Sequence, residues 1–243
     1  MVSIGFKSDR GNLRSGNEDS IFVMPDKNIY IVADGVGGHS AGELASRMAV
    51  GYMAQYVAIN SVDAVQSEEE LKDFFLSCYS GANSLIYNKS SEELDKKGMA
   101  TTAVAAYIKG DMAYVINVGD SRCYLVRDGA CYQVTEDHSY VNAMVKSGLL
   151  TREEAEKHPD RNMITRALGA EEDVEPDFFS FPVYPKDVLI LCTDGLYGEV
   201  SEEKMVQFAD YSKTMHSMAK NLVDEANRHG GKDNISVICV KVL

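Results

Sequence analysis

Short apolar runs with the length of β-strands recur along this sequence from end to end. Several are separated by segments with hairpin chemistry, such as Lys109-Gly110-Asp111 and Arg127-Asp128-Gly129. A chain with this pattern is expected to build antiparallel sheet, at least through its middle. The runs interpreted as strands are residues 20–24, 29–33, 101–108, 112–118, 122–126, 188–193 and 235–242.

Helical periodicity occupies three other segments. Apolar residues keep one helical face over residues 41–59, through Leu44, Met48, Tyr52 and Tyr56, and another over residues 68–94. A third helix is predicted over residues 214–228, stopped by the glycines at 230 and 231. Because helices bracket the strands, we expect strands in the middle layers and helices packed outside them.

No repeat, low-complexity tract or linker divides the 243 residues, so a single domain over residues 1–243 is predicted. The stretch 139–168 differs from its surroundings. It is polar, contains Gly148, and starts a short helix with the capping box Thr151-x-x-Glu154. We interpret it as an inserted surface subdomain, and such excursions often carry substrate contacts.

Charge and cysteine usage exclude several functions. With 24 Lys and Arg against 37 Asp and Glu, the formal net charge is −13, which disfavours nucleic acid and anionic membrane surfaces as partners. The five cysteines form no C-x-x-C pair, which indicates buried thiols in a reducing compartment. The N-terminus shows no secretion signal, and no apolar run reaches the roughly 20 residues of a membrane span. We therefore expect a soluble cytoplasmic protein.

Carboxylates stand at the ends of several apolar strands. Asp34 follows residues 29–33, Asp120 follows residues 112–118, Asp194 follows residues 188–193, and Asp233 precedes the last strand. An unpaired carboxylate at the mouth of a buried strand is costly, and several converging acids would repel one another without a cation. The plain alternative is that Asp-Gly marks a turn, which suffices for Asp128-Gly129 but fits Asp34 and Asp194 less well, because helices follow them.

Oxygen ligands without a nearby His or Cys cluster select Mg²⁺ or Mn²⁺ rather than Zn²⁺. Two such ions sharing a carboxylate can hold a bridging water and lower its pKa, which yields a hydroxide for in-line attack at phosphorus. Arg14 is the candidate for gripping the phosphoryl oxygens, because a guanidinium binds phosphate as a bidentate fork. A lone arginine is more often a surface residue, so Arg14 carries little weight alone.

Other routes to phosphate chemistry lack their residues in this sequence. There is no Cys-x5-Arg, no Asp-x-Asp and no Gly-x-Ser-x-Gly elbow, and Gly231-Lys232 is followed by Asp233 rather than by Ser or Thr, so a P-loop is excluded. Water activated by metal ions is the chemistry that remains.

The ordered motifs resemble those of the metal-dependent protein phosphatases of type 2C, in their compact bacterial form. The similarity runs from Arg14 to Ser236, nearly the whole chain, and the set of motifs is far more specific than any one of them. The matching segments are RSGNED at 14–19, VADGVGGH at 32–39, AGE at 41–43, TTA at 101–103, GDSR at 119–122, TEDHS at 135–139, TRALG at 165–169, LCTDGL at 191–196 and GKDNIS at 231–236.

The resemblance implies an α+β fold, a four-layer α-β-β-α sandwich with two central antiparallel sheets flanked by helix pairs and a flap at residues 139–168. It implies two Mn²⁺ or Mg²⁺ ions per active site, and a third in bacterial members. In the family pattern, Asp34 would bridge the two metals and the Gly35 carbonyl would complete the coordination of one of them. Asp194 and Asp233 would hold the other metal, and Asp120 together with Asp194 would hold the third. Arg14 would bind the phosphate, and Glu18, Asp19 and Asn234 would support the metal waters and their surroundings.

Two departures from the family pattern stand out. The usual Gly-Met-Gly-Thr-Thr is Gly-Met-Ala-Thr-Thr here, with Ala100 in the middle. Eukaryotic members place a histidine directly after Asp-Gly, whereas this chain has Val36 there and His39 three positions later. His39 is either a general acid for the leaving alkoxide or a loop residue that bonds backbone, and His138, at the start of the flap, is interpreted as structural.

The function implied is hydrolysis of phosphoserine and phosphothreonine in proteins without a covalent intermediate, opposing a bacterial Ser/Thr kinase. We expect a monomer that binds phosphorylated proteins and neither nucleic acid nor membrane. Two alternatives stay open. One is a relative acting on a small regulatory phosphoprotein, such as an anti-sigma antagonist. The other is a catalytically dead scaffold for phosphoproteins, which the presence of Asp34, Asp194 and Asp233 disfavours.

Overall fold

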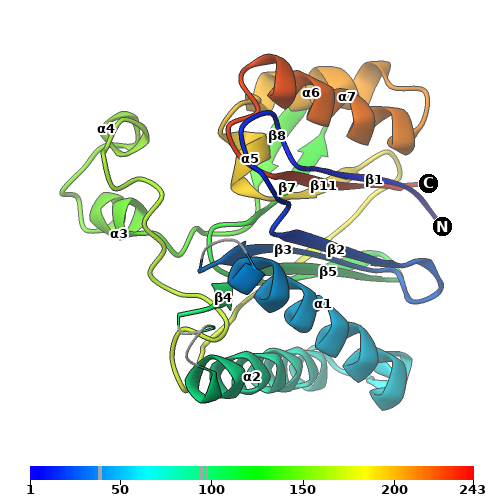
Figure 1. Ribbon diagram of the computed structural model, residues 1–243. Helices are drawn as coiled ribbons and strands as arrows, with labels where there is room; N and C mark the ends of the chain where they lie inside the picture. The colour runs from blue at the N-terminus through cyan, green and yellow to red at the C-terminus, as the bar shows by residue number, and fades with distance from the viewer. Residues whose placement is uncertain (38–39, 94–95, 97) are drawn as a thin grey trace.

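The computed structural model describes residues 1–37, 40–93, 96 and 98–243. Two antiparallel sheets lie face to face in its centre, and every strand pairing within them is antiparallel (Figure 1). The first sheet has the spatial order β1 (Val2–Asp9), β11 (Ile235–Val242), β10 (Val188–Cys192), β7 (Arg122–Arg127) and β8 (Ala130–Gln133).

The second sheet contains the remaining strands. Its spatial order is β2 (Asp19–Met24), β3 (Ile29–Val36), β5 (Ala103–Lys109), β6 (Met112–Val118) and β9 (Asp177–Pro182), with the short β4 (Ala100–Thr101) paired to β3. The strand predicted over residues 101–108 is therefore two strands, interrupted at Thr102. At this interruption, the backbone N–H and the side-chain hydroxyl of Thr102 form hydrogen bonds with the backbone of Asp34.

Helix pairs cover the outer faces of the two sheets, as the sequence predicts (Figure 1). The helices are α1 (Ser40–Asn60) and α2 (Glu68–Glu92) on the second sheet, α5 (Asp194–Tyr197), α6 (Glu202–Tyr211) and α7 (Met215–Arg228) on the first, and α3 (Tyr140–Lys146) and α4 (Arg152–Glu156) in the flap, with short 3₁₀ turns at Pro25–Lys27 and Val62–Ala64. The four-layer α-β-β-α order is thus confirmed. The prediction for α2 extended to Leu94, which lies outside the described residues.

The continuous apolar runs arise because the central strands are covered on both faces. In β3, Ile29 and Ile31 belong to the core under α1 and α2, whereas Tyr30 and Val32 belong to the core between the sheets. Strands β10 and β11 alternate in the same way between the core under α6 and α7 and the core between the sheets. A strand with two dry faces shows no polar alternation, so its sequence is apolar throughout.

The face that α1 buries differs from the predicted one. Its fully buried series is Ala45, Ala49, Met53 and Val57, one position beyond the predicted series through Leu44. Small side chains let this helix approach the sheet closely, and they contribute little to an apolar periodicity. The predicted tyrosines instead face α2. The Tyr52 hydroxyl lies where a side chain at Gly81 would be, and the ring of Tyr56 packs edge-on against Phe74 at 5.2 Å.

Several elements were not predicted, namely β1, β9, α3 and α6. The helix expected after Asp194 is α5, and the strand-like run expected after Asp128-Gly129 is β8. Strands β1, β8 and β9 lie at the edges of the sheets, where one side of the strand is open and the sequence mixes polar with apolar residues. The capping box at Thr151 is present as predicted and starts α4. All five cysteines are free, and all except Cys131 are buried, which confirms the interpretation of their apolar surroundings.

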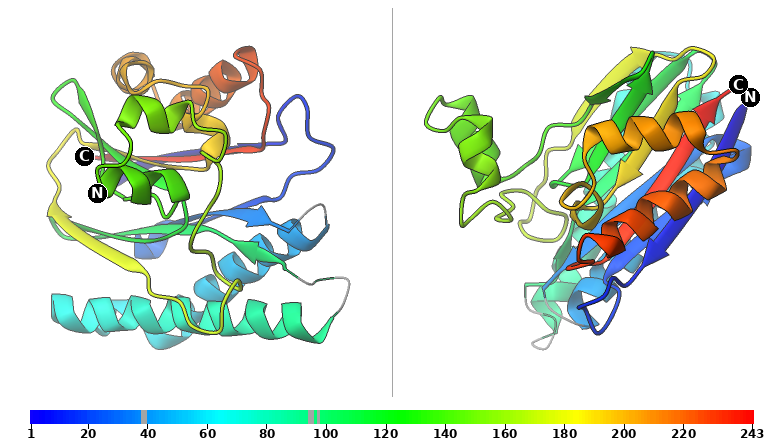
Figure 2. Two further views of the ribbon diagram at one scale, coloured as in Figure 1. Left: turned by 90° about the vertical axis from the view of Figure 1, so that its left-hand side faces the viewer. Right: turned by 90° about the horizontal axis from the view of Figure 1, so that it is seen from above.

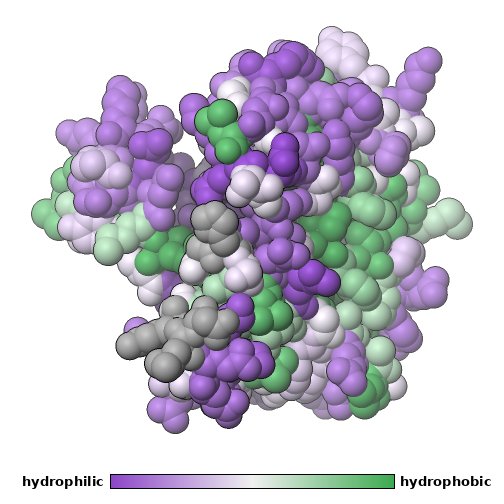
Figure 3. Space-filling view, in the orientation of Figure 1, coloured by the Kyte–Doolittle hydropathy of each residue, from purple (hydrophilic) through white to green (hydrophobic). Residues whose placement is uncertain are grey.

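The flap projects from one end of the sheets, away from both helix pairs (Figures 1 and 2). The visible face of the molecule is mostly polar, with an apolar area over the open edges β1 and β2 (Figure 3). Partly buried side chains of the core between the sheets, including Val2, Ile4, Ile21 and Val23, belong to these strands. Within the described residues, none of the helices combines the length and the apolar character needed to cross a membrane.

Candidate active site

The first pair of site carboxylates faces across two neighbouring strands. Asp19 begins β2 and stands directly opposite Asp34 in the β2–β3 register. Asp34 lies inside β3, which continues to Val36, so the expectation that this strand ends at Ala33 was wrong. The extension is held from the side, because Asp34 donates its N–H to Thr102 Oγ1 at 2.9 Å and its carbonyl accepts from Thr102 N at 2.9 Å and from Thr101 Oγ1 at 2.8 Å.

The second pair lies at the facing end of the first sheet. Asp194 opens α5 two residues after the end of β10, with Thr193 as the N-cap between them, and Asp233 lies just before β11. A side chain at Gly195 would lie 2.0 Å from the carbonyl oxygen of Asn234, so the two segments approach backbone to backbone. Thr193 joins this end to the other sheet, because its Oγ1 donates to Asp19 Oδ2 at 2.9 Å. The two sheets therefore bring their acids together at one edge of the sandwich.

These acids destabilise one another's charged forms. Burial first, and then the charges of Asp19, Asp194, Asp120 and Asp233, raise the pKa of Asp34 well above its usual range. Burial likewise raises the pKa of Asp19 and that of Asp120 to about 7, and burial with the charge of Asp233 raises that of Asp194 to about 6. A cluster with such values gains from any bound cation that neutralises it.

The donor set fits a hard divalent cation. Asp19 Oδ1 and Asp194 Oδ1 are buried and have no hydrogen-bond partner among the described residues, although buried polar atoms are normally paired. In the described part of the chain, no three Asp, Glu, His or Cys side chains close around one point as a ready-made cage. Mg²⁺ does not need one, because it usually binds through one or two carboxylates and keeps several waters.

Arg14 lies at the exposed rim of this cluster. Its Nη2 donates to Asp233 Oδ2 at 2.6 Å, and half of its side chain is open to solvent. Asn234 holds the loop that carries it, because its Nδ2 donates to the carbonyls of Arg10 and Gly16 while its Oδ1 accepts from Glu18 N. The Glu18 carbonyl in turn accepts from Gly35 N at 3.2 Å. The predicted residues Arg14, Glu18 and Asn234 thus belong to one connected rim.

Two polar residues near the site have roles that the sequence analysis did not assign. Thr102, besides holding Asp34, lies 2.7 Å through its hydroxyl from the hydroxyl of Ser121, beside Asp120. Tyr197 donates its hydroxyl to the carbonyl of Asp120 at 3.0 Å. Thr102 was quoted within a matching motif, and its break in an apolar run was the available signal. Tyr197 lies three positions after Asp194, and nothing in the sequence marks its long-range contact.

Gly35 is a point of close backbone approach between β3 and α1. A Cβ there would lie 2.0 Å from the carbonyl oxygen of Gly42 and 2.7 Å from that of Glu18. We expect Gly35→Ala to lower the free energy of unfolding by about 3 kcal/mol, because backbone must move. Gly51→Ala, in the exposed interior of the same α1, meets no described atom within 4 Å and should raise it by about 0.5–1 kcal/mol. Urea unfolding of both variants measures this, and equal effects would contradict the close approach.

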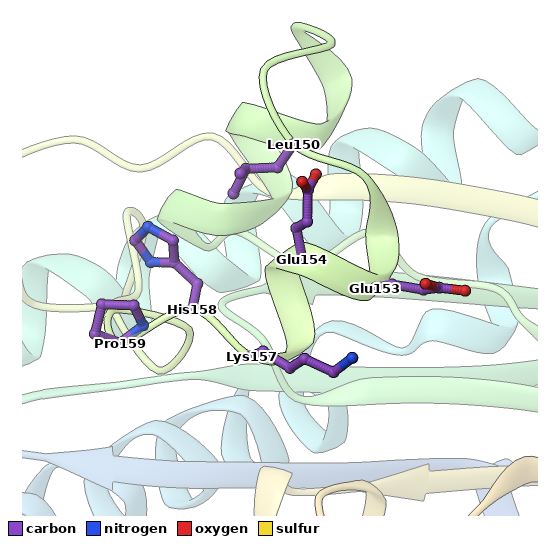
Figure 4. Close-up of a pocket in the computed structure, with 6 residues that line it drawn as sticks. All are labelled: Leu150, Glu153, Glu154, Lys157, His158 and Pro159. Atoms are coloured by element: carbon purple, nitrogen blue, oxygen red, sulfur yellow. The ribbon is translucent and has the colours of Figure 1, made fainter.

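His39 lies outside the described residues, so its two interpretations stand as predictions. A separate hollow of about 350 Å³ lies within the flap and is distinct from the acid cluster (Figure 4). In Figure 4, His158 and Pro159 lie on one side of it, while Glu153 and Lys157 extend to the other. None of the predicted site residues lines this hollow.

Comparison with known proteins identifies the family of this chain. The family model described as "Protein phosphatase 2C" matches residues 12–229. The chain belongs to this family. The serine/threonine phosphatase stp of Listeria monocytogenes is 39% identical over 97% of this chain and 94% of its own length, and Streptococcus pneumoniae protein phosphatase PhpP is 34% identical over 99% and 98%.

Solved structures extend the likeness to three dimensions. The serine/threonine phosphatase of S. agalactiae superposes with a TM-score of 0.94 at 36% identity over both complete chains. The catalytic domain of PstP, solved with two manganese ions, superposes with a TM-score of 0.86 at 32% identity over the whole of both chains. This chain is therefore a metal-dependent serine/threonine protein phosphatase that uses Mn²⁺ or Mg²⁺ and acts on phosphoproteins.

Proposed function

We propose that this phosphatase carries out its reaction at the acid cluster where the two sheets meet. The observation that supports this most is the convergence of Asp19, Asp34, Asp120 and Asp194. Burial raises the pKa of each, and so does the charge of a nearby acid, which is Asp233 for Asp194 and Asp194 for the other three. Buried like charges are retained when a ligand neutralises them. The reaction implied is direct hydrolysis of phosphoserine and phosphothreonine.

The proposed roles follow the family pattern and the geometry. When bound, Mn²⁺ or Mg²⁺ supplies an activated water and neutralises charge on the phosphoryl group. Asp34 and the Gly35 carbonyl would hold one ion, Asp194 and Asp233 would hold the second, and Asp120 with Asp194 would hold a third. Asp19, Glu18 and Asn234 keep these groups in place, through the hydrogen bonds to Thr193 and Gly35 and around the Arg14 loop.

Arg14 is the proposed phosphate-binding residue. Its guanidinium is anchored at one nitrogen by Asp233, which leaves the other N–H groups for an incoming phosphoryl group at the exposed rim. Arg14 would therefore bind the phosphoryl group from the rim, beside the acids that would hold the ions. No covalent enzyme intermediate is needed, since water is the nucleophile.

Arg14→Ala should lower kcat/KM for a phosphothreonine peptide by roughly 10–100-fold, because charged hydrogen bonds to the phosphate are lost. Most of the loss should be in KM. The matched control is Arg10→Ala, an exposed arginine four residues earlier that contributes only its carbonyl to the same loop. Steady-state kinetics of both variants decide the point, and a similar loss in Arg10→Ala would remove the special role of Arg14.

The test of the proposed function is release of phosphate from a phosphothreonine peptide and from para-nitrophenyl phosphate. Activity is expected with Mn²⁺ and should vanish when EDTA is added. Activity that persists in EDTA would contradict the metal assignment. A folded protein inactive with every divalent ion would instead favour a phosphoprotein-binding scaffold.

We propose one catalytic domain over residues 1–243 with a flap at 139–168, acting as a cytoplasmic monomer against the products of a Ser/Thr kinase. The five free thiols suit a reducing compartment. The surplus of acidic residues gives no support for binding to nucleic acid or to anionic membranes.

A further inference from the structure

A histidine at the start of the flap contacts the loop that carries Asp120 directly. Gly119 donates its N–H to His138 Nδ1 at 3.1 Å, and its carbonyl accepts from His138 N at 3.0 Å. The histidine side chain is only 8% exposed. His138 therefore engages both backbone polar groups of Gly119, the residue directly before Asp120.

These contacts fix the protonation of the ring. Because Nδ1 accepts a hydrogen bond from a backbone amide, the proton of the neutral ring is on Nε2. Nε2 lies 3.1 Å from Asp177 Oδ2, which accepts from it. Arg166 Nη1 lies 3.0 Å from the same Nε2, and with the proton on Nε2 it donates instead to the Glu175 carbonyl at 2.7 Å and to Asp177 Oδ1 at 3.0 Å. Burial, ahead of the opposing influence of Asp177, lowers the pKa of His138, so the ring is neutral.

The far side of the same loop is anchored to the active site. Gly119 has a φ of +104°, and a Cβ there would lie 2.5 Å from Thr102 Cγ2, so the loop lies tightly on the residue that holds Asp34. The hydroxyls of Ser121 and Thr102 lie 2.7 Å apart, and Tyr197 donates to the Asp120 carbonyl. The loop is thus held between the acid cluster on one side and His138 on the other.

We propose that His138 is a positioning residue for the reaction, which fixes Gly119 and so sets where Asp120 presents its carboxylate. The inference rests on the proposed role of Asp120 as a metal ligand. His138 also accepts from Thr165 N through its carbonyl at 2.8 Å, so both ends of the flap meet at this residue. A displacement of the flap ends can therefore reach Asp120 through His138, beside the ion pair of Arg122 with Asp137 at 2.6 Å.

The competing interpretation is that His138 only supports the flap. The two interpretations differ in kinetics. Displacement of Asp120 lowers kcat on every substrate, including para-nitrophenyl phosphate, which is too small to need the flap. Loss of flap support would raise KM for a phosphopeptide and leave the small substrate unaffected.

Two substitutions separate the contributions of the two ring nitrogens of His138, because each variant can keep only one of the two hydrogen bonds. In His138→Asn, the amide oxygen can take the place of Nδ1 and accept from Gly119. In His138→Gln, the longer amide can reach Asp177 in the place of Nε2 but presents no acceptor near Gly119. Both remove the ring and its packing, so thermal melting should show similar losses. Asp120→Ala is the reference for complete loss of the carboxylate.

We expect His138→Gln to lower kcat by roughly 10–100-fold on both substrates, the range typical of residues that orient metal ligands, with KM unchanged. It should also weaken the last Mn²⁺ equivalent measured by calorimetry, as Asp120→Ala does. His138→Asn should keep most of the wild-type kcat and most of the affinity for the last Mn²⁺ equivalent. Equal losses in the two variants, or an increase confined to the KM of the peptide, would overturn the proposal.

The wild-type protein provides an independent test if the variants fold poorly. Long-range ¹H–¹⁵N correlation of the metal-free protein should show His138 neutral with the proton on Nε2, and the Gly119 amide should exchange slowly. A proton on Nδ1, or rapid exchange at Gly119, would overturn the proposed contact between His138 and Gly119. If the wild type lacked phosphatase activity altogether, the proposed function would fail, but this measurement would still test the contact between His138 and Gly119.

Discussion

Asp194→Asn should abolish metal-dependent turnover and at the same time stabilise the metal-free protein. Turnover should fall by about 10³-fold or more, because the ions contribute several kcal/mol to stabilising charge in the transition state. The free energy of unfolding in EDTA should rise by about 1–3 kcal/mol, since burial and then the charge of Asp233 raise the pKa of Asp194 to about 6, and an uncharged amide escapes this penalty. Kinetics with Mn²⁺ and urea unfolding in EDTA measure the two effects.

The matched control for this variant is Asp128→Asn. Asp128 occurs in the same Asp-Gly dipeptide, but it lies exposed in the β7–β8 hairpin, in the left-handed conformation that asparagine tolerates. Neither activity nor stability should change there by more than about 0.5 kcal/mol. Full activity in Asp194→Asn, or a loss of metal-free stability, would show that this acid is not part of a metal-binding cluster.

Raising the pH should destabilise the metal-free protein. Asp19 and Asp120 titrate near pH 7 and Asp194 near pH 6 in the folded chain, against about 4 in the unfolded chain. The folded state therefore binds more protons between about pH 4 and pH 7, and stability that is fully present below pH 4 is lost as the pH rises through 7. We expect the free energy of unfolding in EDTA to fall by roughly 2–5 kcal/mol from pH 5 to pH 8.

Metal ions should reverse this trend, because they bind the deprotonated carboxylates and favour the folded state. Saturating Mn²⁺ should give a protein whose stability rises with pH over the same range. Asp19→Asn should reduce the slope measured in EDTA, since it removes one of the titrating groups. A metal-free protein equally stable at pH 5 and pH 8 would contradict the mutual repulsion.

Much of the architecture is predictable from sequence because its signal is local. Strands buried on both faces, such as β3 and β10, have uninterrupted apolar runs, and the acids Asp34 and Asp194 follow those runs directly. The metal chemistry follows from residue types and from the absence of other phosphate motifs. The family resemblance then supplies the roles, which residue chemistry alone leaves as one alternative among several.

The remainder depends on contacts between distant segments. The buried face of α1 consists of Ala45 and its small neighbours, which periodicity undervalues. The position of Asp19 opposite Asp34 is set by strand register, and the contact of Tyr197 with Asp120 joins segments 77 residues apart. The link from His138 to Gly119 also needs the folded backbone, since only there do a side-chain acceptor and a distant amide meet.

Calorimetric titration of Mn²⁺ into the EDTA-treated and desalted protein tests the central claim most directly. The account predicts two tightly bound ions per chain, as many as in the structure of the PstP catalytic domain. It predicts that Asp194→Asn loses tight binding, while Asp120→Ala retains the tight pair and loses mainly turnover. Absence of tight binding in the wild type, or tight binding unchanged in Asp194→Asn, would contradict the assignment of the cluster as the metal centre.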